Sequence, residues 1–203
     1  MAVHSTAKKK NGADKRDRIL RAAIKVFAKN GFYATRVSEI AKAAGVADGT
    51  IYLYFKNKDD VLITIFEDGI QRLLSILREV AESDEPYERR ITRVIELQLG
   101  LLEEQRDLAE VITVNLRQSS NLLKQYAAPL FMEYIDVIAG LVREGQKQGA
   151  FRKDVNARVV ARALFGALDA ILLTWALGEA DPAGLRKAAS HCASLFLEGL
   201  VTR

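Results

Sequence analysis

The stretch "GVADGTIYLYFKNKDD", residues 45–60, decides the fold of the first part of the chain. Gly45 can adopt the left-handed backbone that a tight turn needs, and Asp48 can cap a short helix that follows the turn. Ile51 and Phe55 lie four residues apart in that helix, so both should face a core. The two tyrosines of the segment then point toward the outside, which predicts a binding surface on a short third helix at about 49–54.

Two helical stretches precede this segment. Apolar residues recur at helical spacing over residues 14–29, which end at "NG", and again over 37–44, where Thr35 is placed to cap the second stretch. Two short helices joined by a glycine turn form a helix-turn-helix motif. Residues 1–60 are therefore predicted to form a three-helix DNA-binding domain, and residues 1–13 a flexible basic tail.

The charge of the chain is distributed unevenly. The total is +4, yet residues 1–60 carry 13 Lys and Arg against 6 Asp and Glu, and the remainder is net acidic. Neutralising phosphates with Lys and Arg releases condensed counterions, so this asymmetry predicts a polyanionic partner for the first third of the chain. Lys8 to Lys10 alone could equally be a solvated tail.

The rest of the chain reads as long helices with almost no strand signal. Pro129 should kink its helix or shift the start, and Gly149 should end that helix. The predicted fold is all-α with about nine helices, in which residues 61–203 form a second, larger helical domain. The predicted helices beyond residue 60 are 61–81, 86–104, 106–119, 121–148, 154–178 and 181–202.

Composition indicates a cytoplasmic protein without a membrane span. The single cysteine cannot form an internal disulfide, the N-terminus lacks an apolar signal, and Asp169 interrupts the most apolar stretch, 163–177. We find no phosphate-cradling glycine loop, metal-spaced set or nucleophile elbow. Adjacent His191 and Cys192 project in different directions from a helix. We therefore expect no catalytic residue, no metal and no cofactor, and an enzyme stays a rival only through acidic pairs such as Glu103/Glu104.

The third helix suits the major groove of DNA. A hydroxyl on Thr50 and the nearby backbone amides can meet a phosphate at a helix N-terminus. Tyr52 and Gly49 can approach base edges, while Tyr54 and Lys58 lie toward the sugar-phosphate walls. In the alternative interpretation the tyrosines are half-buried aromatics and the lysines only solubilise a helix end.

The segment "ILRAAIKVFAKNGFYATRVSEIAKAAGVADGTIYLYFKNKDDVL" resembles the N-terminal domain of the TetR family of bacterial transcriptional repressors over its whole length. This family consists of all-helical homodimers with a larger ligand-binding body, whose last two long helices pair in a four-helix bundle. The resemblance therefore implies that residues 61–203 form a ligand-binding and dimerisation domain. An acid at position 48 departs from an ideal base reader, so it either caps the helix or accepts from a cytosine amino group. The resemblance implies phosphate contacts by Thr50, Tyr54 and Lys58, positions at or near bases for Asp48, Gly49 and Tyr52, and a backbone or base-edge position for Ser38.

The segments "ITVNLRQSSN" and "ALFGALDAILLTWALG" are similar to the subgroup that represses fatty-acid degradation and responds to long-chain acyl-CoA. An acyl-CoA needs an apolar tunnel for its chain and cationic donors for its phosphates. The resemblance implies a tunnel lined by Leu116, Phe131, Leu164, Phe165, Leu168, Ile171 and Trp175, with phosphate donors at Arg117, Gln118 and Asn121. The same apolar residues could instead form a core or dimer seam, and Asp169 could pair with Arg162 or with an arginine from another helix.

These observations predict a dimeric repressor of fatty-acid metabolism genes that binds a palindromic operator and is released by long-chain acyl-CoA. Two alternatives share the fold. One is a repressor of an efflux or other gene that responds to a different hydrophobic ligand, and its pocket should lack a phosphate-binding arginine. The other is a chromosome-binding protein without a ligand, whose body should be tightly packed.

Overall fold

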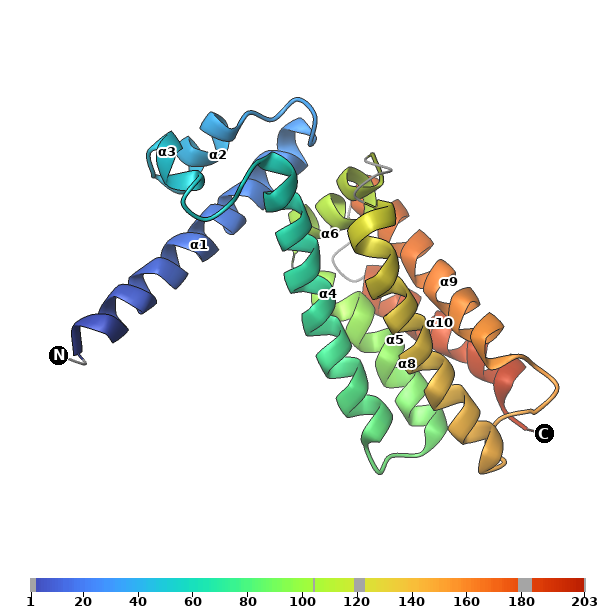
Figure 1. Cartoon of the computed structure of the whole chain (residues 1–203). Helices are drawn as coiled ribbons and strands as arrows, with labels where there is room; N and C mark the ends of the chain where they lie inside the picture. Colours follow the sequence, from blue (N-terminus) through green and yellow to red (C-terminus); the bar gives the residue numbers. More distant parts are fainter. Residues whose placement is uncertain (1–2, 104, 119–122, 179–183, 203) are drawn as a thin grey trace.

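The computed structural model describes residues 3–103, 105–118, 123–178 and 184–202, and these residues are almost entirely helical (Figure 1). An isolated bridge between Phe151 and Val201 is the only β pairing among them. The all-α fold class is confirmed. The elements are α1 Val3–Asn30, α2 Val37–Ala44, α3 Asp48–Ile51, α4 Lys58–Glu82, α5 Tyr87–Glu103, α6 Arg106–Glu110, the π-helix η1 Val111–Asn115, the 3₁₀-helix η2 Leu116–Gln118, the π-helix η3 Leu123–Ala127, α8 Ala128–Lys147, α9 Ala157–Leu177 and α10 Gly184–Leu200.

The head consists of α1, α2 and α3, which pack around a small apolar core. Ile51 and Phe55 are buried in this core, as predicted, together with Phe27 of α1. Gly45 ends α2 with φ of +64°, a backbone conformation that favours glycine. The Arg18 guanidinium of α1 donates to the Ala44 carbonyl at 2.8 Å. The glycine turn of the helix-turn-helix is therefore held from outside by α1.

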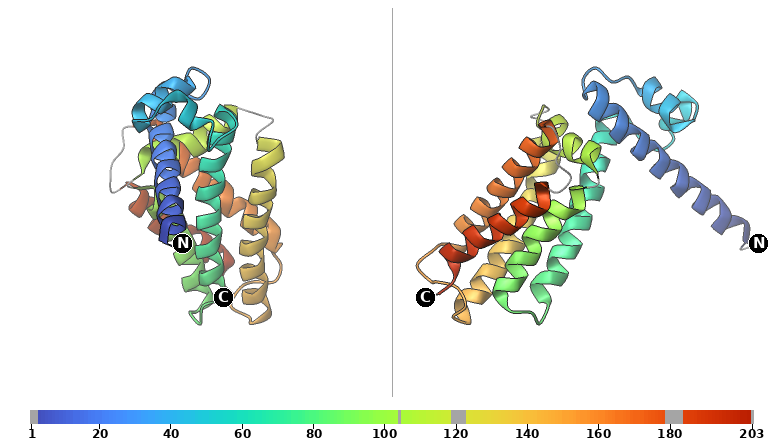
Figure 2. Two further views of the ribbon diagram at one scale, coloured as in Figure 1. Left: turned by 60° about the vertical axis from the view of Figure 1, so that its left-hand side comes forward. Right: turned by 180° about the vertical axis from the view of Figure 1, so that it is seen from behind.

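The backbone is helical from Val3, so residues 3–13 continue α1 away from the body (Figure 2), while the flexibility expected of this basic segment stays a prediction. Two other local predictions for the head, both about helix caps, were wrong. Thr35 does not cap α2, because its hydroxyl donates to the Gly31 carbonyl at 2.8 Å; Glu39 instead accepts from the Arg36 N–H. Asp48 is the first residue of α3 and not its cap, which is Ala47.

The body is a bundle in which α8 packs on α9 and α5 packs on α10 (Figures 1 and 2). Pro129 lies in the first turn of α8 and shifts its start, one of the two predicted effects. Gly149 follows the end of α8 with φ of +81°. The helix expected over 106–119 is present only as α6, η1 and η2, with a change of hydrogen-bond pattern at each junction. Such π-helical turns occur frequently at functional sites.

The longest apolar helix is α9, whose length and mean hydropathy of 1.7 would by themselves suffice to cross a membrane. Only 28% of that apolar window is buried within the chain. Val159 and Leu177 of α9 and Leu195 of α10 are exposed, and a groove of about 390 Å³ runs between the two helices. An acidic residue in the middle of α9, Asp169, is paired with an arginine. These features are typical of a helix with one packed and one unpartnered face.

The head and the body meet where α1 lies against α6 and η1. The Phe32 N–H, in the loop after α1, donates to Asn115 Oδ1 of η1 at 2.7 Å, and this bond is buried. At the surface, Arg16 of α1 pairs with Asp68 of α4 at 3.1 Å. A buried hydrogen bond thus links the head directly to the π-helical turn of the body.

Candidate functional site

The first candidate surface lies on α3 and the turn that follows it. Tyr52 is 57% exposed and points outward as predicted, while Thr50 and Tyr54 are half-buried at its edges. Gly49 is exposed, and a Cβ placed there would meet no atom within 4 Å. Ser38 is exposed on α2. The structure therefore brings six of the seven predicted DNA-contacting residues to exposed or half-buried positions on α2, α3 and the following turn.

Lys58 is also half-buried, but it lies at the start of α4 and its ammonium is engaged within the chain. Its ammonium donates to the carbonyls of Phe32, Tyr33 and Thr35 at 2.7, 3.1 and 2.9 Å, and it lies 4.6 Å from the centre of the Phe32 ring. These three bonds use all three N–H donors of a lysine. Lys58 therefore holds the loop after α1 in this structure, and its predicted phosphate contact would require it to exchange at least one of these bonds.

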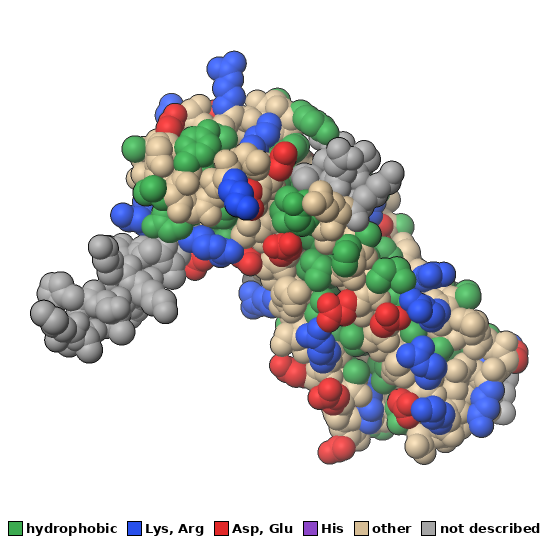
Figure 3. Space-filling view, in the orientation of Figure 1, with side chains coloured by type: hydrophobic (Ala, Val, Ile, Leu, Met, Phe, Trp, Pro, Cys, Tyr) green, Lys and Arg blue, Asp and Glu red, His purple; other side chains and the backbone are tan. Residues whose placement is uncertain are grey.

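One residue of this surface was missed. Leu53, two residues after the end of α3, is 80% exposed, and an apolar side chain on a groove-reading surface can contact thymine methyl groups. Its position between two tyrosines was the available signal, since a helical period that buries Ile51 and Phe55 turns Leu53 outward. Hydrophobic and basic side chains gather over this part of the head in Figure 3.

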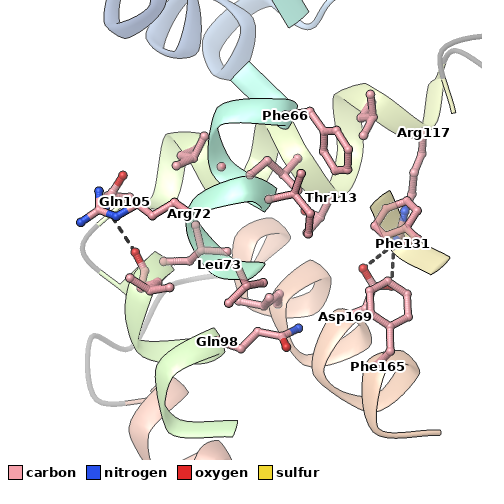
Figure 4. Close-up of a pocket in the computed structure, with 18 residues that line it drawn as sticks. Phe66, Arg72, Leu73, Gln98, Gln105, Thr113, Arg117, Phe131, Phe165 and Asp169 are labelled. Carbon is pink, nitrogen blue, oxygen red and sulfur yellow. Dashed lines mark hydrogen bonds and ion pairs between the residues drawn. The ribbon is translucent and has the colours of Figure 1, made fainter. Parts of the chain in front are cut away.

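The second candidate site is a cavity of about 480 Å³ inside the body, within the size range of small-molecule pockets. It lies between α4, α5, α6, η1, α8 and α9 (Figure 4). Its wall is mostly apolar and includes three of the predicted tunnel residues, Leu116, Phe131 and Phe165. Phe66, Phe131 and Phe165 form a chain of aromatic contacts with centroids 5.3–5.4 Å apart. The body is therefore hollow where a ligand-free structural protein was expected to be tightly packed.

Charged groups lie at two separate places on the cavity wall. Arg117 Nη2 donates to both carboxylate oxygens of Asp169 at 2.5 Å, so the arginine predicted to bind phosphate is paired with α9 instead. The sequence left two possible partners for Asp169, Arg162 or an arginine from another helix. The structure shows the second. Arg72 of α4 lies beside Gln105 on another part of the wall (Figure 4).

Several other predicted wall residues are placed differently. Leu164 and Leu168 are fully buried in the core, and neither they nor Ile171 and Trp175 are among the residues that line this cavity. Asn121 lies outside the residues that the structure describes, and for Gln118 only the backbone is described. Much of the wall comes from residues that the sequence did not single out, among them Gly69, Arg72 and Leu73 of α4, Gln98 of α5 and Thr113 of η1.

A polar pair is buried next to the cavity. The Tyr134 hydroxyl donates to Gln98 Oε1 at 2.6 Å, and Gln98 itself faces the cavity. Burial, with a smaller effect from the Cys192 thiol, raises the pKa of Tyr134 far above its ordinary value. The phenol is therefore a neutral hydrogen-bond donor that fixes the orientation of the Gln98 amide.

A helix-turn-helix head joined to a helical body with a ligand-sized cavity is the architecture of a transcription regulator that carries its DNA-binding and ligand-binding domains in the same polypeptide. Residues 19–65 match the family described as bacterial regulatory proteins, tetR family, and residues 66–199 match the YsiA-like protein C-terminal region. The chain belongs to the TetR family of transcription regulators.

Fatty-acid regulators are among the most similar known proteins. The fatty acid metabolism regulator protein of Bacillus subtilis is 35% identical over 161 residues, which cover 79% of this chain and 83% of the relative. The fatty acid degradation regulator FadR of Bacillus halodurans superimposes with a TM-score of 0.84 at 33% identity, covering 93% of this chain and 97% of that chain. The Bacillus subtilis FadR in complex with stearoyl-CoA gives a TM-score of 0.81 at 32% identity, covering 90% and 97%.

Proposed function

We propose that the chain is a cytoplasmic, dimeric repressor of fatty-acid metabolism genes that binds a palindromic operator and is released by long-chain acyl-CoA. The observation that carries this proposal is the apolar cavity of about 480 Å³ with cationic groups on its wall. An acyl chain requires such an apolar enclosure, and its CoA end requires cations nearby. The similarity to a FadR crystallised with stearoyl-CoA supports the same ligand class.

Dimerisation through α9 and α10 is the second part of the proposal. Their unpartnered apolar faces, with Val159, Leu177 and Leu195 exposed, would be covered by the same helices of a second copy. Such a dimer presents two copies of α3, which fit successive major grooves when they are about 34–36 Å apart. A ligand releases this dimer only if it binds a differently spaced form more tightly.

The proposal is tested by operator release. A random duplex library first selects the operator, and operator binding is then titrated with acyl-CoAs of increasing chain length. Long-chain acyl-CoA is expected to weaken operator binding roughly 5–150-fold, the usual range of allosteric coupling, while free CoA has no effect. If no acyl-CoA alters operator affinity or thermal stability, the effector class is wrong. Release by a different hydrophobic compound would then favour the efflux-type alternative.

The DNA surface gives a separate prediction. Tyr52→Ala is expected to weaken binding to the selected operator about tenfold or more, since one lost base contact costs roughly 1–3 kcal/mol, while binding to unrelated DNA changes little. Tyr54→Phe keeps the half-buried ring and removes only the hydroxyl, so it should weaken binding to both DNAs alike. Fluorescence anisotropy with the two duplexes distinguishes these patterns. Equal losses on both duplexes for Tyr52→Ala would contradict a base-reading role.

A further inference from the structure

The cavity in the body borders a second, basic depression. A groove of about 440 Å³ lies between the head and α6, and Gln105 and Leu108 line both this groove and the cavity. On the head side its wall is formed by α1 and the end of α2, which include Arg18, Arg21 and Lys25. Two side chains are thus common to an apolar chamber and a cationic groove.

The cations of this groove differ in how far they are engaged. Arg18 donates to the carbonyls of Ala44 and Gly45, so it already serves the helix-turn-helix. Arg21 and Lys25 are exposed and have no hydrogen-bond or ion-pair partner within the described part of the chain. Asp107 of α6 also faces the groove and is its one acidic residue. The groove therefore has two unpaired cationic side chains and one carboxylate, so its net charge is positive even without Arg18.

Arg72 extends this positive region to the cavity itself. It is exposed on α4, lines the cavity and lies beside Gln105 (Figure 4). Like Arg21 and Lys25, it has no partner among the residues that the structure describes. Arg117, by contrast, is neutralised by both oxygens of Asp169. The unengaged cations consequently lie at the Gln105 part of the cavity wall and not at the Arg117 part.

We infer that the nucleotide end of an acyl-CoA, with its diphosphate and 3′-phosphate, lies in the groove between α1 and α6 on Arg21 and Lys25. The acyl chain lies in the cavity, and the flexible pantetheine arm passes Arg72, Gln105 and Leu108. This inference rests on the proposed function, since it takes acyl-CoA as the effector. Phosphates prefer such charge-assisted donors. A ligand placed in this way contacts the head through α1 and the body through α6, so it fixes their relative orientation.

The test compares two ligands that differ only in the phosphorylated end. Palmitoyl-CoA and S-palmitoyl-pantetheine share the acyl chain and thioester, but the second lacks the nucleotide and its phosphates. Binding of each is measured by calorimetry, below the micelle concentration, to the full chain and to Arg21→Gln/Lys25→Gln. An Arg143→Gln/Lys153→Gln variant serves as the control, because it removes the same charge from exposed positions outside both the cavity and the groove.

We expect the Arg21→Gln/Lys25→Gln variant to bind palmitoyl-CoA roughly tenfold more weakly and palmitoyl-pantetheine unchanged, while the control binds both normally. Unchanged binding of palmitoyl-CoA would overturn the inference, as would an equal loss for both ligands. If only Arg117→Gln abolishes the preference for palmitoyl-CoA over palmitoyl-pantetheine, the nucleotide lies at the Arg117 part of the cavity wall, and the inference is also overturned. If the unmodified chain binds neither ligand, the proposed function itself fails.

Discussion

A Lys58→Met variant is expected to lose about 2–4 kcal/mol of stability in the head, and with it binding to every DNA. The ammonium donates to three carbonyls of the loop after α1 and lies over the Phe32 ring. Methionine keeps the length of the side chain but removes all three charge-assisted donors. The loop between α1 and α2 then loses the ammonium that donates to three of its carbonyls. The same change removes the contact between this loop and the start of α4.

Hydrogen exchange of the head amides, compared with those of α5 and α8, measures this loss directly. Lys56→Met is the matched control, since Lys56 is exposed two residues earlier and its side chain has no recorded partner in the described structure. A phosphate-binding Lys58 would behave differently. Its replacement would leave exchange in the head unchanged and lower the salt dependence of operator binding by about one counterion.

Lys58 illustrates which part of the site can be predicted from sequence. Ile51, Phe55 and Tyr52 were placed correctly because burial within one short helix follows from its period. The partners of Lys58 are 23–26 residues away in the chain. A basic residue at the end of a DNA-binding segment has the same local pattern whether it contacts a phosphate or a distant carbonyl, so only the fold distinguishes the two roles.

The body shows the same limit on a larger scale. The number and order of its helices follow from amphipathic periods. Pro129 lies in the first turn of α8, in agreement with one of the two effects predicted for it. The cavity does not follow from them, because an apolar stripe looks alike whether it fills a core or lines a chamber. Leu168 fills the core and Phe165, three residues earlier, lines the cavity. The pairing of Arg117 could likewise not be predicted, because its partner Asp169 is 52 residues away in the sequence.

Asn115 is expected to transmit the effector signal, so Asn115→Leu should abolish most of the release of operator by palmitoyl-CoA. Asn115 is buried in η1, and its Oδ1 accepts from the Phe32 N–H of the head at 2.7 Å. Ile112 and Thr113 of the same π-helical turn line the cavity. A ligand that displaces this turn therefore moves an acceptor to which the head is directly bonded. Leucine has a similar size but leaves the Phe32 N–H unpaired, at a cost of about 1–3 kcal/mol.

The measured quantity is the ratio of operator affinity without and with saturating palmitoyl-CoA. We expect this ratio to fall at least roughly tenfold in Asn115→Leu, toward one, while palmitoyl-CoA itself still binds. Thr113→Val is the control within the same turn, because the Thr113 hydroxyl donates to the Ala109 carbonyl at 2.7 Å and not to the head. Thr113 also lines the cavity, so the ratio is taken at a palmitoyl-CoA concentration that saturates this variant, and it should then be unchanged. If Asn115→Leu keeps the full ratio, the signal travels through another contact between head and body. The Arg16 to Asp68 pair between α1 and α4 is then the next link to remove, because it connects the two parts without involving η1.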